Sequence, residues 1–433
     1  MLNNQFVLKG SIAYTPEFNS FKLHDTSFLV CKDGKVVGVF DTLPELYSKY
    51  PIYDYSGQVI IPGMSDLHMH APQYAFRGIG QNMENSQWGT WFEKYAFPEE
   101  SNYSDLVYAR KAYSKLISDL LKTPTTRVSM FATIHRPATE LLMQLLANAG
   151  FAGFVGKVNM DRNSTNGLIE TTEESLDETE LWLNNTLNKY QNMKPIITPR
   201  YIPTCTDDLL QGLGKLSIQY NVPIQSHLLE GLDEIEWVKE IKPNISCYAQ
   251  GYDMYSLLGS CMPTLMAHCV YPSQADFQLM TQRKIWVAHC PGGNMHSTGG
   301  IAPILKYLRA GVRVGLASDT AGGNTINMFR ILLEAVMASK TYWAFKIQCN
   351  DPWAKKDYLT IANAFYLATK GGGSFFGKVG SFEPGYCFDA VVIDDVRLVD
   401  FKPRSLYERV ERIINLADDR DIVAKFVNGK KIL

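Results

Sequence analysis

Several features that would assign this chain to a simple class are missing. The 433 residues carry a formal net charge of −2, so no strong positive field favours nucleic acid or an anionic membrane surface. Residues 1–10 lack the basic and apolar regions of a signal peptide, and no apolar run is long enough to span a bilayer. We therefore expect no nucleic-acid partner, no membrane association and a cytoplasmic location.

Cysteine and glycine motifs are also scarce. None of the eight cysteines forms a Cys-x-x-Cys pair, and the Pro-Cys-x-x-Cys signature of cytidine-type zinc deaminases is missing. The glycine run at 371–373 lacks the spacing of a phosphate-binding loop. The chain therefore has no disulfide framework in its pattern, and we expect reduced, mostly buried thiols.

The two ends of the chain differ in pattern from its middle. Short apolar runs flank Asp33-Gly34 near the start and Asn428-Gly429 near the end, and both dipeptides predict β-hairpins. The segments 1–61 and 381–433 therefore predict one small β-sandwich domain that is built from both termini.

Between the ends, short runs typical of buried strands alternate with longer amphipathic stretches, which predicts an α/β fold. Eight strand–helix units are the count for a (β/α)₈ TIM-type barrel, and we expect that catalytic barrel over residues 62–380. The expected strands are 64–68, 128–133, 153–158, 196–201, 223–227, 265–269, 285–289 and 312–317.

Histidines gather at the ends of these expected strands. The chain has eight histidines, of which five lie there: His68, His70, His227, His268 and His289. Catalytic groups of such barrels lie at the carboxyl ends of the strands. A spacing of two residues on a strand also directs two side chains to the same side. The pattern therefore predicts a metal site.

We assign three imidazoles and one carboxylate to a single ion, a donor set that suits Zn²⁺, with Fe²⁺ as a possible substitute. The expected ligands are His68, His70, His227 and Asp319. The ion would bring the pKa of a bound water towards about 7, and Asp319 would take its proton. Glu230 would shuttle protons, and His268 would hydrogen-bond the oxygen at the attacked carbon.

Each assignment has an ordinary structural alternative. Glu230 could be the first exposed residue of the next helix, and Asp319 could be a turn residue. Arg200 could be a surface salt-bridge partner, the commonest role of an arginine. Lys157 could be a carbamylated ligand between two metals, although one ion already has four ligands. We expect His289 to be an ordinary polar residue whose hydrogen bonds are satisfied.

Several short motifs extend over nearly the whole chain. One group consists of Pro62-Gly63-x-x-Asp66-x-His68-x-His70, Ser226-His227-x-x-Glu230, Ala267-His268 and Ser318-Asp319. A second group includes His70-Ala71-Pro72-Gln73-Tyr74, Lys94-Tyr95-x-Phe97-Pro98, Thr198-Pro199-Arg200 and Ala288-His289-Cys290-Pro291. On the first group the chain resembles the metal-dependent amidohydrolase superfamily. On the second it resembles, within that superfamily, the guanine deaminase family.

The resemblance implies zinc at the four expected ligands, a catalytic Glu230 and a homodimer. It also implies that Gln73, Arg200 and the neighbouring aromatic residue, Tyr201, bind a purine. The implied reaction is the hydrolysis of guanine to xanthine and ammonia, with Glu230 and His268 also touching the substrate. Position 201 departs from the phenylalanine that the family often has, and the stretch 292–296 departs as well.

The residue types agree with such a substrate. Arg200 offers a fixed fork of donors to a carbonyl oxygen, and Gln73 offers both a donor and an acceptor. Downstream aromatic residues could form an apolar wall: Phe76, Trp88, Trp91, Phe92 and Phe97. The alternatives are another aminated heterocycle (pterin, cytosine or s-triazine), a binuclear cyclic-amide hydrolase that uses Lys157, or a non-catalytic scaffold.

Overall fold

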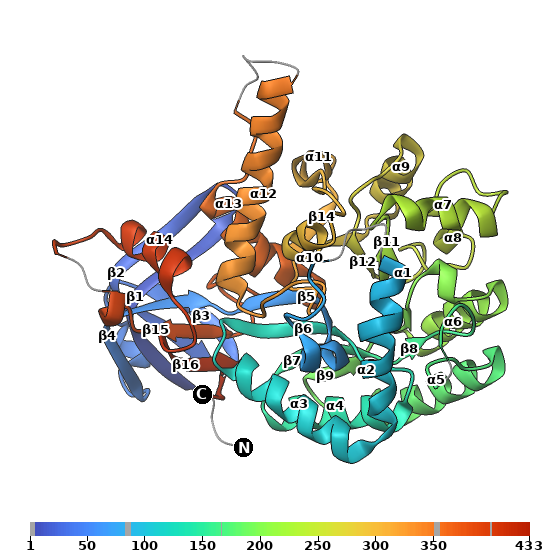
Figure 1. Cartoon of the computed structure of the whole chain (residues 1–433). Coiled ribbons are helices and arrows are strands. Elements are labelled where there is room, and N and C mark those ends of the chain that lie inside the picture. Colours follow the sequence, from blue (N-terminus) through green and yellow to red (C-terminus); the bar gives the residue numbers. More distant parts are fainter. Residues whose placement is uncertain (1–4, 83–87, 166, 350–355, 399–400) are drawn as a thin grey trace.

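One seven-stranded sheet combines strands from both ends of the chain (Figure 1). The computed structural model describes residues 5–82, 88–165, 167–349, 356–398 and 401–433. The sheet has the order β17-β16-β15-β4-β1-β2-β3. Its strands are β1 (Gln5–Glu17), β2 (Ser20–Lys32), β3 (Lys35–Phe40), β4 (Ile52–Pro62), β15 (Ala390–Ile393), β16 (Ile422–Val427) and β17 (Lys430–Lys431).

Both predicted hairpins are present in this sheet. Asp33 and Gly34 link β2 to β3 with φ of 52° and 74°, and Asn428 and Gly429 link β16 to β17 with φ of 49° and 73°. Asparagine, aspartate and glycine tolerate this left-handed backbone, which matches the twist of the strands. The described parts of the two terminal segments form one sheet, not two facing ones, so the sandwich remains a prediction.

A buried ion pair holds this sheet against the middle of the chain. Arg127 donates from Nε and Nη2 to the two oxygens of Asp389, at 2.6 and 3.0 Å. The backbone N–H of Gly63, between β4 and the next strand, donates to the carbonyl oxygen of Asp389 at 3.0 Å. Breaking a buried pair of this kind costs about 3–5 kcal/mol. The start of the first central strand is therefore firmly fixed.

The middle of the chain contains two four-stranded parallel sheets, one with the order β5-β6-β7-β9 and the other with the order β11-β12-β13-β14. The strands are β5 (Met64–His70), β6 (Thr125–Phe131), β7 (Ala152–Gly156), β9 (Met193–Pro195), β11 (Ile224–Leu228), β12 (Thr264–His268), β13 (Trp286–His289) and β14 (Arg313–Leu316). A strand lies at each of the eight expected positions, which confirms the mixed α/β character of the chain.

The two sheets approach each other at both edges. Ile197 forms a parallel bridge with Ile224, and the backbone N–H of Asp319 donates to the carbonyl oxygen of His68 at 2.8 Å. The described residues nevertheless form no closed eight-stranded sheet, so closure of the barrel remains a prediction.

The fourth expected strand, 196–201, differs most from its prediction. The chain there forms β9, which ends at Pro195, and the short β10 (Thr198–Pro199), which pairs with β8 (Val158–Asn159). Proline has no N–H to donate to a ladder, so the two prolines interrupt the strand. The following residues, Arg200 and Tyr201, lie outside the strands, although the backbone N–H of Arg200 still donates to the carbonyl oxygen of Asn159 at 3.2 Å.

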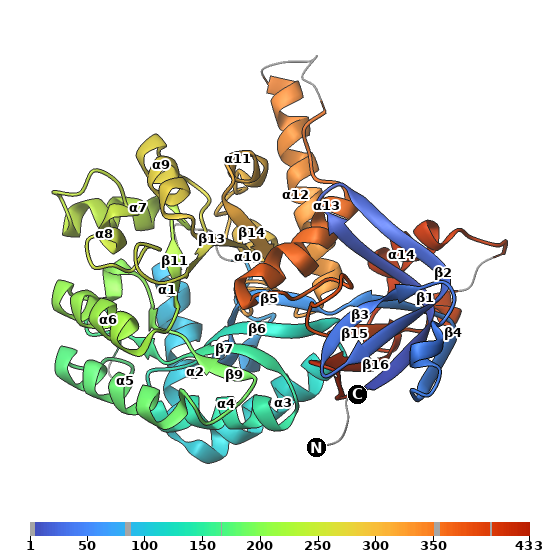
Figure 2. The same ribbon diagram turned by 180° about the vertical axis from the view of Figure 1, so that it is seen from behind.

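Most helices cover the outside of the two parallel sheets (Figures 1 and 2). The longer ones are α3 (Leu106–Leu121), α4 (Arg136–Asn148), α5 (Thr172–Thr186), α6 (Asp207–Tyr220), α7 (Leu232–Ile241), α9 (Gln274–Arg283), α12 (Met328–Cys349) and α14 (Leu406–Leu416). The shorter ones are α1 (Trp88–Trp91), α2 (Phe97–Ser101), α8 (Gln250–Asp253), α10 (Pro291–His296), α11 (Ile304–Arg309) and α13 (Ile361–Tyr366). Of these helices, α13 and α14 lie against β1 and β2 of the seven-stranded sheet instead. No helix among the described residues could cross a bilayer.

Candidate metal and ligand site

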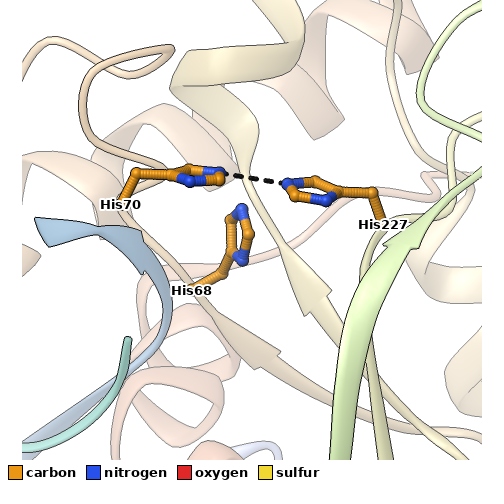
Figure 3. A group of neighbouring side chains, drawn as sticks. All are labelled: His68, His70 and His227. Carbon is orange, nitrogen blue, oxygen red and sulfur yellow. Dashed lines mark hydrogen bonds between the residues drawn. The ribbon is translucent and has the colours of Figure 1, made fainter. Parts of the chain in front are cut away.

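Three imidazoles meet where β5 and β11 end (Figure 3). His68 and His70 lie on β5 and His227 on β11, and a ring nitrogen of each lies within 4.8 Å of the others. The closest pair is His70 Nε2 and His227 Nε2, which are 3.0 Å apart. All three side chains are buried. The spacing of two residues on β5 thus directs both histidines to one side, as the sequence predicts.

The tautomer of His227 shows what this group can bind. His227 Nδ1 lies 2.6 Å from the carbonyl oxygen of Arg200. A carbonyl oxygen only accepts, so Nδ1 carries the hydrogen and Nε2 directs a lone pair at His70. Burial, together with the neighbouring His68, holds the pKa of His70 and of His227 well below the usual value, so both rings are neutral.

These neutral nitrogens fit a divalent cation. Two nitrogens that are each about 2.1 Å from one tetrahedral ion lie about 3.4 Å apart, close to the separation of His70 and His227. His70 Nδ1 is buried and has no hydrogen-bond partner among the residues that the structure describes, so those residues offer this ring little compensation. The donor set therefore suits a metal that binds imidazole.

A carboxylate lies beside the imidazoles. Asp319 Oδ1 is 3.3 Å from His68 Nε2, and His68, His268 and Asp319 form a second group of possible ligand atoms within 4.8 Å. A Cβ at Gly293 would lie 1.9 Å from Asp319 Oδ2, so only glycine leaves room for this carboxylate. The unusual stretch at 292–296 thus has a direct role in placing Asp319. We call His68, His70, His227 and Asp319 the imidazole wall.

Glu230 and His268 lie side by side next to this wall. Glu230 Oε2 is 3.6 Å from His268 Nε2. Burial is the main cause that raises the pKa of Glu230 to about 7. The Asp319 carboxylate also raises this pKa, whereas His268 lowers it. Burial lowers the pKa of His268, but the carboxylates of Glu230 and Asp319 outweigh it and raise that pKa above its usual value. Both groups can therefore exchange protons near neutral pH.

Asn294 orients His268, a role that the sequence does not reveal. Its Oδ1 lies 2.8 Å from His268 Nδ1, which therefore carries the hydrogen and leaves Nε2 facing Glu230. Asn294 is buried on α10, just after β13. The only signal was its place in a glycine-rich stretch that departs from the expected pattern.

A second polar group also borders the site. Arg200 follows β10, and Gln73 lies in the 3₁₀ helix Ala71–Phe76. Arg200 donates from Nη1 and Nη2 to the two oxygens of Glu100, at 2.7 and 3.0 Å, and Gln73 Nε2 donates to Glu100 Oε1 at 2.8 Å. We call Gln73, Glu100 and Arg200 the arginine wall. The sequence predicts Gln73 and Arg200 here but not Glu100, which lies two residues after the Phe97-Pro98 motif.

A cavity of about 280 Å³ connects the two walls. Its polar lining includes Gln73, Arg200, Glu230, His268 and Asp319, and its apolar lining includes Trp91, Phe92, Tyr201 and Trp237. The rings of Tyr201 and Trp237 are 6.2 Å apart, and burial raises the pKa of the Tyr201 hydroxyl. A planar molecule in this cavity would thus meet both aromatic surfaces and polar groups.

The other expected aromatic residues have different places. Phe97 packs on Arg200, with the guanidinium carbon 5.3 Å from the ring centre. Phe76 packs on Trp91, with the ring centres 5.5 Å apart. The side chain of Trp88 lies outside the described residues. Trp237 also lines the cavity, from α7, and no sequence motif predicts this position for it.

Two further expected residues lie away from the imidazole wall. Lys157 is buried, and its Nζ donates to both oxygens of Glu170 at 2.8 Å. Lys157 thus has a carboxylate partner in this structure, which favours a structural role over that of a carbamylated metal ligand. His289 is buried at the end of β13 and borders a different cavity, beside Ile304. Its Nδ1 is buried and has no hydrogen-bond partner among the described residues, so its role as a satisfied polar residue stays a prediction.

The chain is similar to known proteins along most of its length. Residues 59–432 match the amidohydrolase family. A guanine deaminase from Dictyostelium discoideum is 36% identical over 389 residues, which cover 88% of this chain and 84% of that protein. A guanine deaminase from Escherichia coli is 31% identical over 431 residues, 96% of this chain and 92% of that protein. The structure of guanine deaminase from C. acetobutylicum with guanine bound in its active site is similar with a TM-score of 0.94 and 42% identity, over 99% of this chain and all of that one.

Proposed function

Because the chain belongs to the amidohydrolase family and is similar along most of its length to guanine deaminases, we propose that it hydrolyses guanine to xanthine and ammonia. One observation of the structure carries the proposal: a single cavity is lined by convergent neutral imidazoles and by a guanidinium and a carboxamide that one buried carboxylate holds. The imidazoles suit hydrolysis, and the guanidinium and carboxamide suit a lactam.

We propose His68, His70, His227 and Asp319 as the ligands of one zinc ion, with iron(II) as a possible substitute. The support is the donor set, since three neutral imidazoles and one carboxylate are a common zinc environment. When bound, zinc would lower the pKa of water towards about 7 and so supply hydroxide at neutral pH.

The residues around the cavity then divide the proton transfers. Glu230, with a pKa near 7, donates a proton to N3 of the ring while hydroxide adds to C2. Asp319 takes the remaining proton of the added oxygen. Asp319 returns that proton by way of Glu230 to the exocyclic amine, the C2–N bond breaks, and ammonia leaves. His268, held by Asn294, hydrogen-bonds the oxygen at C2.

Gln73, Arg200 and Tyr201 bind the purine in this proposal. Arg200 faces the carbonyl oxygen at C6, and Gln73 matches adjacent ring positions with its donor and acceptor. Tyr201 lies against one side of the cavity, and its ring is 6.5 Å from that of His227. Glu230 and His268 complete the contacts near C2.

We also propose that the two parallel sheets close into one (β/α)₈ barrel over residues 62–380, with segments 1–61 and 381–433 as a separate small β-domain. The backbone contacts of Ile197 with Ile224 and of Asp319 with His68 support closure at the two edges. The family match over both the parallel sheets and the C-terminal strands supports a single functional unit.

A homodimer in the cytoplasm is the expected state of the protein. Support for the dimer comes from apolar side chains on the projecting helix α12, where Met337 and Phe345 are each 59% exposed (Figure 1). Buried free thiols such as Cys205, Cys269 and Cys290 agree with a reducing compartment. Light scattering coupled to size exclusion measures the oligomeric state directly.

Steady-state ammonia release from guanine, adenine, cytosine and a pterin tests the function, with elemental analysis of the same sample. We expect guanine to be the best substrate and one zinc per chain. A chelator should abolish activity, and zinc should restore it. Full activity in a metal-free sample would contradict the proposal, as would a clear preference for another ring.

A further inference from the structure

We propose that Glu100 is a positioning residue that sets Arg200 and Gln73 to recognise an uncharged lactam. The inference deepens the proposed function, on which it rests for the identity of the substrate. Glu100 does not line the cavity. It lies behind the residues that do, on the short helix α2.

Glu100 fixes the guanidinium of Arg200 in one orientation. Its two oxygens accept from Nη1 and Nη2 of Arg200, an end-on fork that restrains the plane of the group. Phe92 and Phe97 pack on the same guanidinium, with its carbon 5.2 and 5.3 Å from their ring centres. Arginine has five N–H donors, so three remain for a ligand after this fork.

Glu100 also decides which end of Gln73 faces where. Gln73 Nε2 donates to Glu100 Oε1 at 2.8 Å, and Gln73 Oε1 accepts from the backbone N–H of Ala321 at 3.2 Å. Because Glu100 accepts and the Ala321 N–H donates, only one orientation of the Gln73 amide satisfies both bonds. A ligand therefore meets one free N–H and one free lone pair in fixed places.

The charge balance of this group selects the kind of ligand. Glu100 is completely buried, and Arg200 is only 1% exposed. A buried guanidinium needs a compensating charge, and Glu100 supplies it within the protein. An anionic ligand would bring a second negative charge to a pair that is already neutral. A neutral carbonyl needs only the free donors, so the arginine wall suits a lactam.

The test compares Glu100→Gln with Glu99→Gln, which makes the same replacement of one carboxylate oxygen by an NH₂ group at the neighbouring residue. Glu99 accepts from the Tyr108 hydroxyl and is not part of the arginine wall. In Glu100→Gln we expect KM for guanine to rise by about 10-fold or more, since hydrogen bonds to a charged group are lost, while kcat changes less. The preference for guanine over 2-aminopurine, which lacks the C6 carbonyl, should shrink by a similar factor. Zinc content should stay at the wild-type value.

An unchanged KM and an unchanged preference in folded Glu100→Gln would overturn the inference, as would an equal effect of Glu99→Gln. If Glu100→Gln does not fold, Glu100→Asp keeps the charge but withdraws the carboxylate by one methylene. A raised KM in that variant then supports the inference, and a wild-type KM overturns it.

The proposed function fails separately from this inference, because wild-type kinetics on the substrate panel are measured first. If the wild type prefers another lactam, the same variants are compared on that substrate. The role of Glu100 is then judged by KM for that lactam against its analogue without the carbonyl.

Discussion

The imidazole wall and the arginine wall differ in how their charges are balanced. In the imidazole wall, neutral nitrogens of His70 and His227 face each other at 3.0 Å, and their low pKa values keep protons away. In the arginine wall, a buried cation and a buried anion are joined by a bidentate pair. In the imidazole wall, lone pairs face each other, and a bound cation would accept them. In the arginine wall, the charges of Arg200 and Glu100 cancel before any ligand binds.

This difference indicates a division of labour. An incomplete donor set recruits a metal and thereby affects the chemical step. A complete, rigid set recognises a neutral ligand by its remaining donors and thereby affects binding and discrimination. Changes in the imidazole wall and its neighbours should therefore lower kcat or metal content, whereas changes in the arginine wall should raise KM.

The largest effect on kcat/KM should come from removing the C6 oxygen of the substrate, which the arginine wall is proposed to bind. With 2-aminopurine, which keeps the C2 amine but lacks the C6 oxygen, we expect kcat/KM to be about 10⁴-fold below that for guanine, because the Arg200 donors are then left unpaired. Ammonia release measures both substrates. A ratio near one would mean that the arginine wall does not read the carbonyl, and the comparison of the two walls would fail.

Glu230→Gln should lower kcat by about 10³-fold, because the amide cannot donate and accept protons as the carboxyl does. KM for guanine and zinc content should change little. The matched control is Asp233→Asn, which alters an exposed acid that lines the same cavity from α7. Equal losses in both variants would show that negative charge in the cavity, not a proton shuttle at position 230, supports the rate.

Gly293→Ala should weaken zinc binding and activity by about 10–100-fold, because the new Cβ would displace the Asp319 carboxylate from its place. Gly89→Ala is the control, since a Cβ there meets nothing within 4 Å although Gly89 also borders the cavity. Zinc affinity is measured by competition with a chromogenic chelator. Wild-type affinity in Gly293→Ala would remove Asp319 from the proposed ligands.

The imidazole wall could be predicted from the sequence because strands impose simple rules. Side chains two apart on a strand share a side, and the carboxyl ends of parallel strands meet. Those rules place His68, His70 and His227 together, as the structure does. The Asp-Gly and Asn-Gly hairpins follow in the same way from local backbone preferences.

The arginine wall could be predicted only in part. Glu100 lies on α2, which has five residues, too few for a helical pattern to show which side is buried. Its role depends on a contact between residues 100 apart in the chain, which periodicity does not encode. The sequence pattern also predicts one continuous strand over 196–201, whereas the structure has a break there. Pro195 and Pro199 carry no backbone N–H for a strand ladder, and a pattern of side chains does not reveal that gap. Asn294 depends equally on a distant contact, to His268.

Asn294→Leu should have the smallest effect of the series, a fall in kcat of about 10-fold. Without the Asn294 acceptor, His268 is free to change its tautomer, so Nε2 no longer faces Glu230 in one protonation state. KM and zinc content should stay near wild type, because neither wall is touched. Ser297→Ala is the control, since its buried hydroxyl bonds only to backbone carbonyls of the same turn. A larger rise in KM than fall in kcat would place His268 with the recognition of the ring and not with the chemical step.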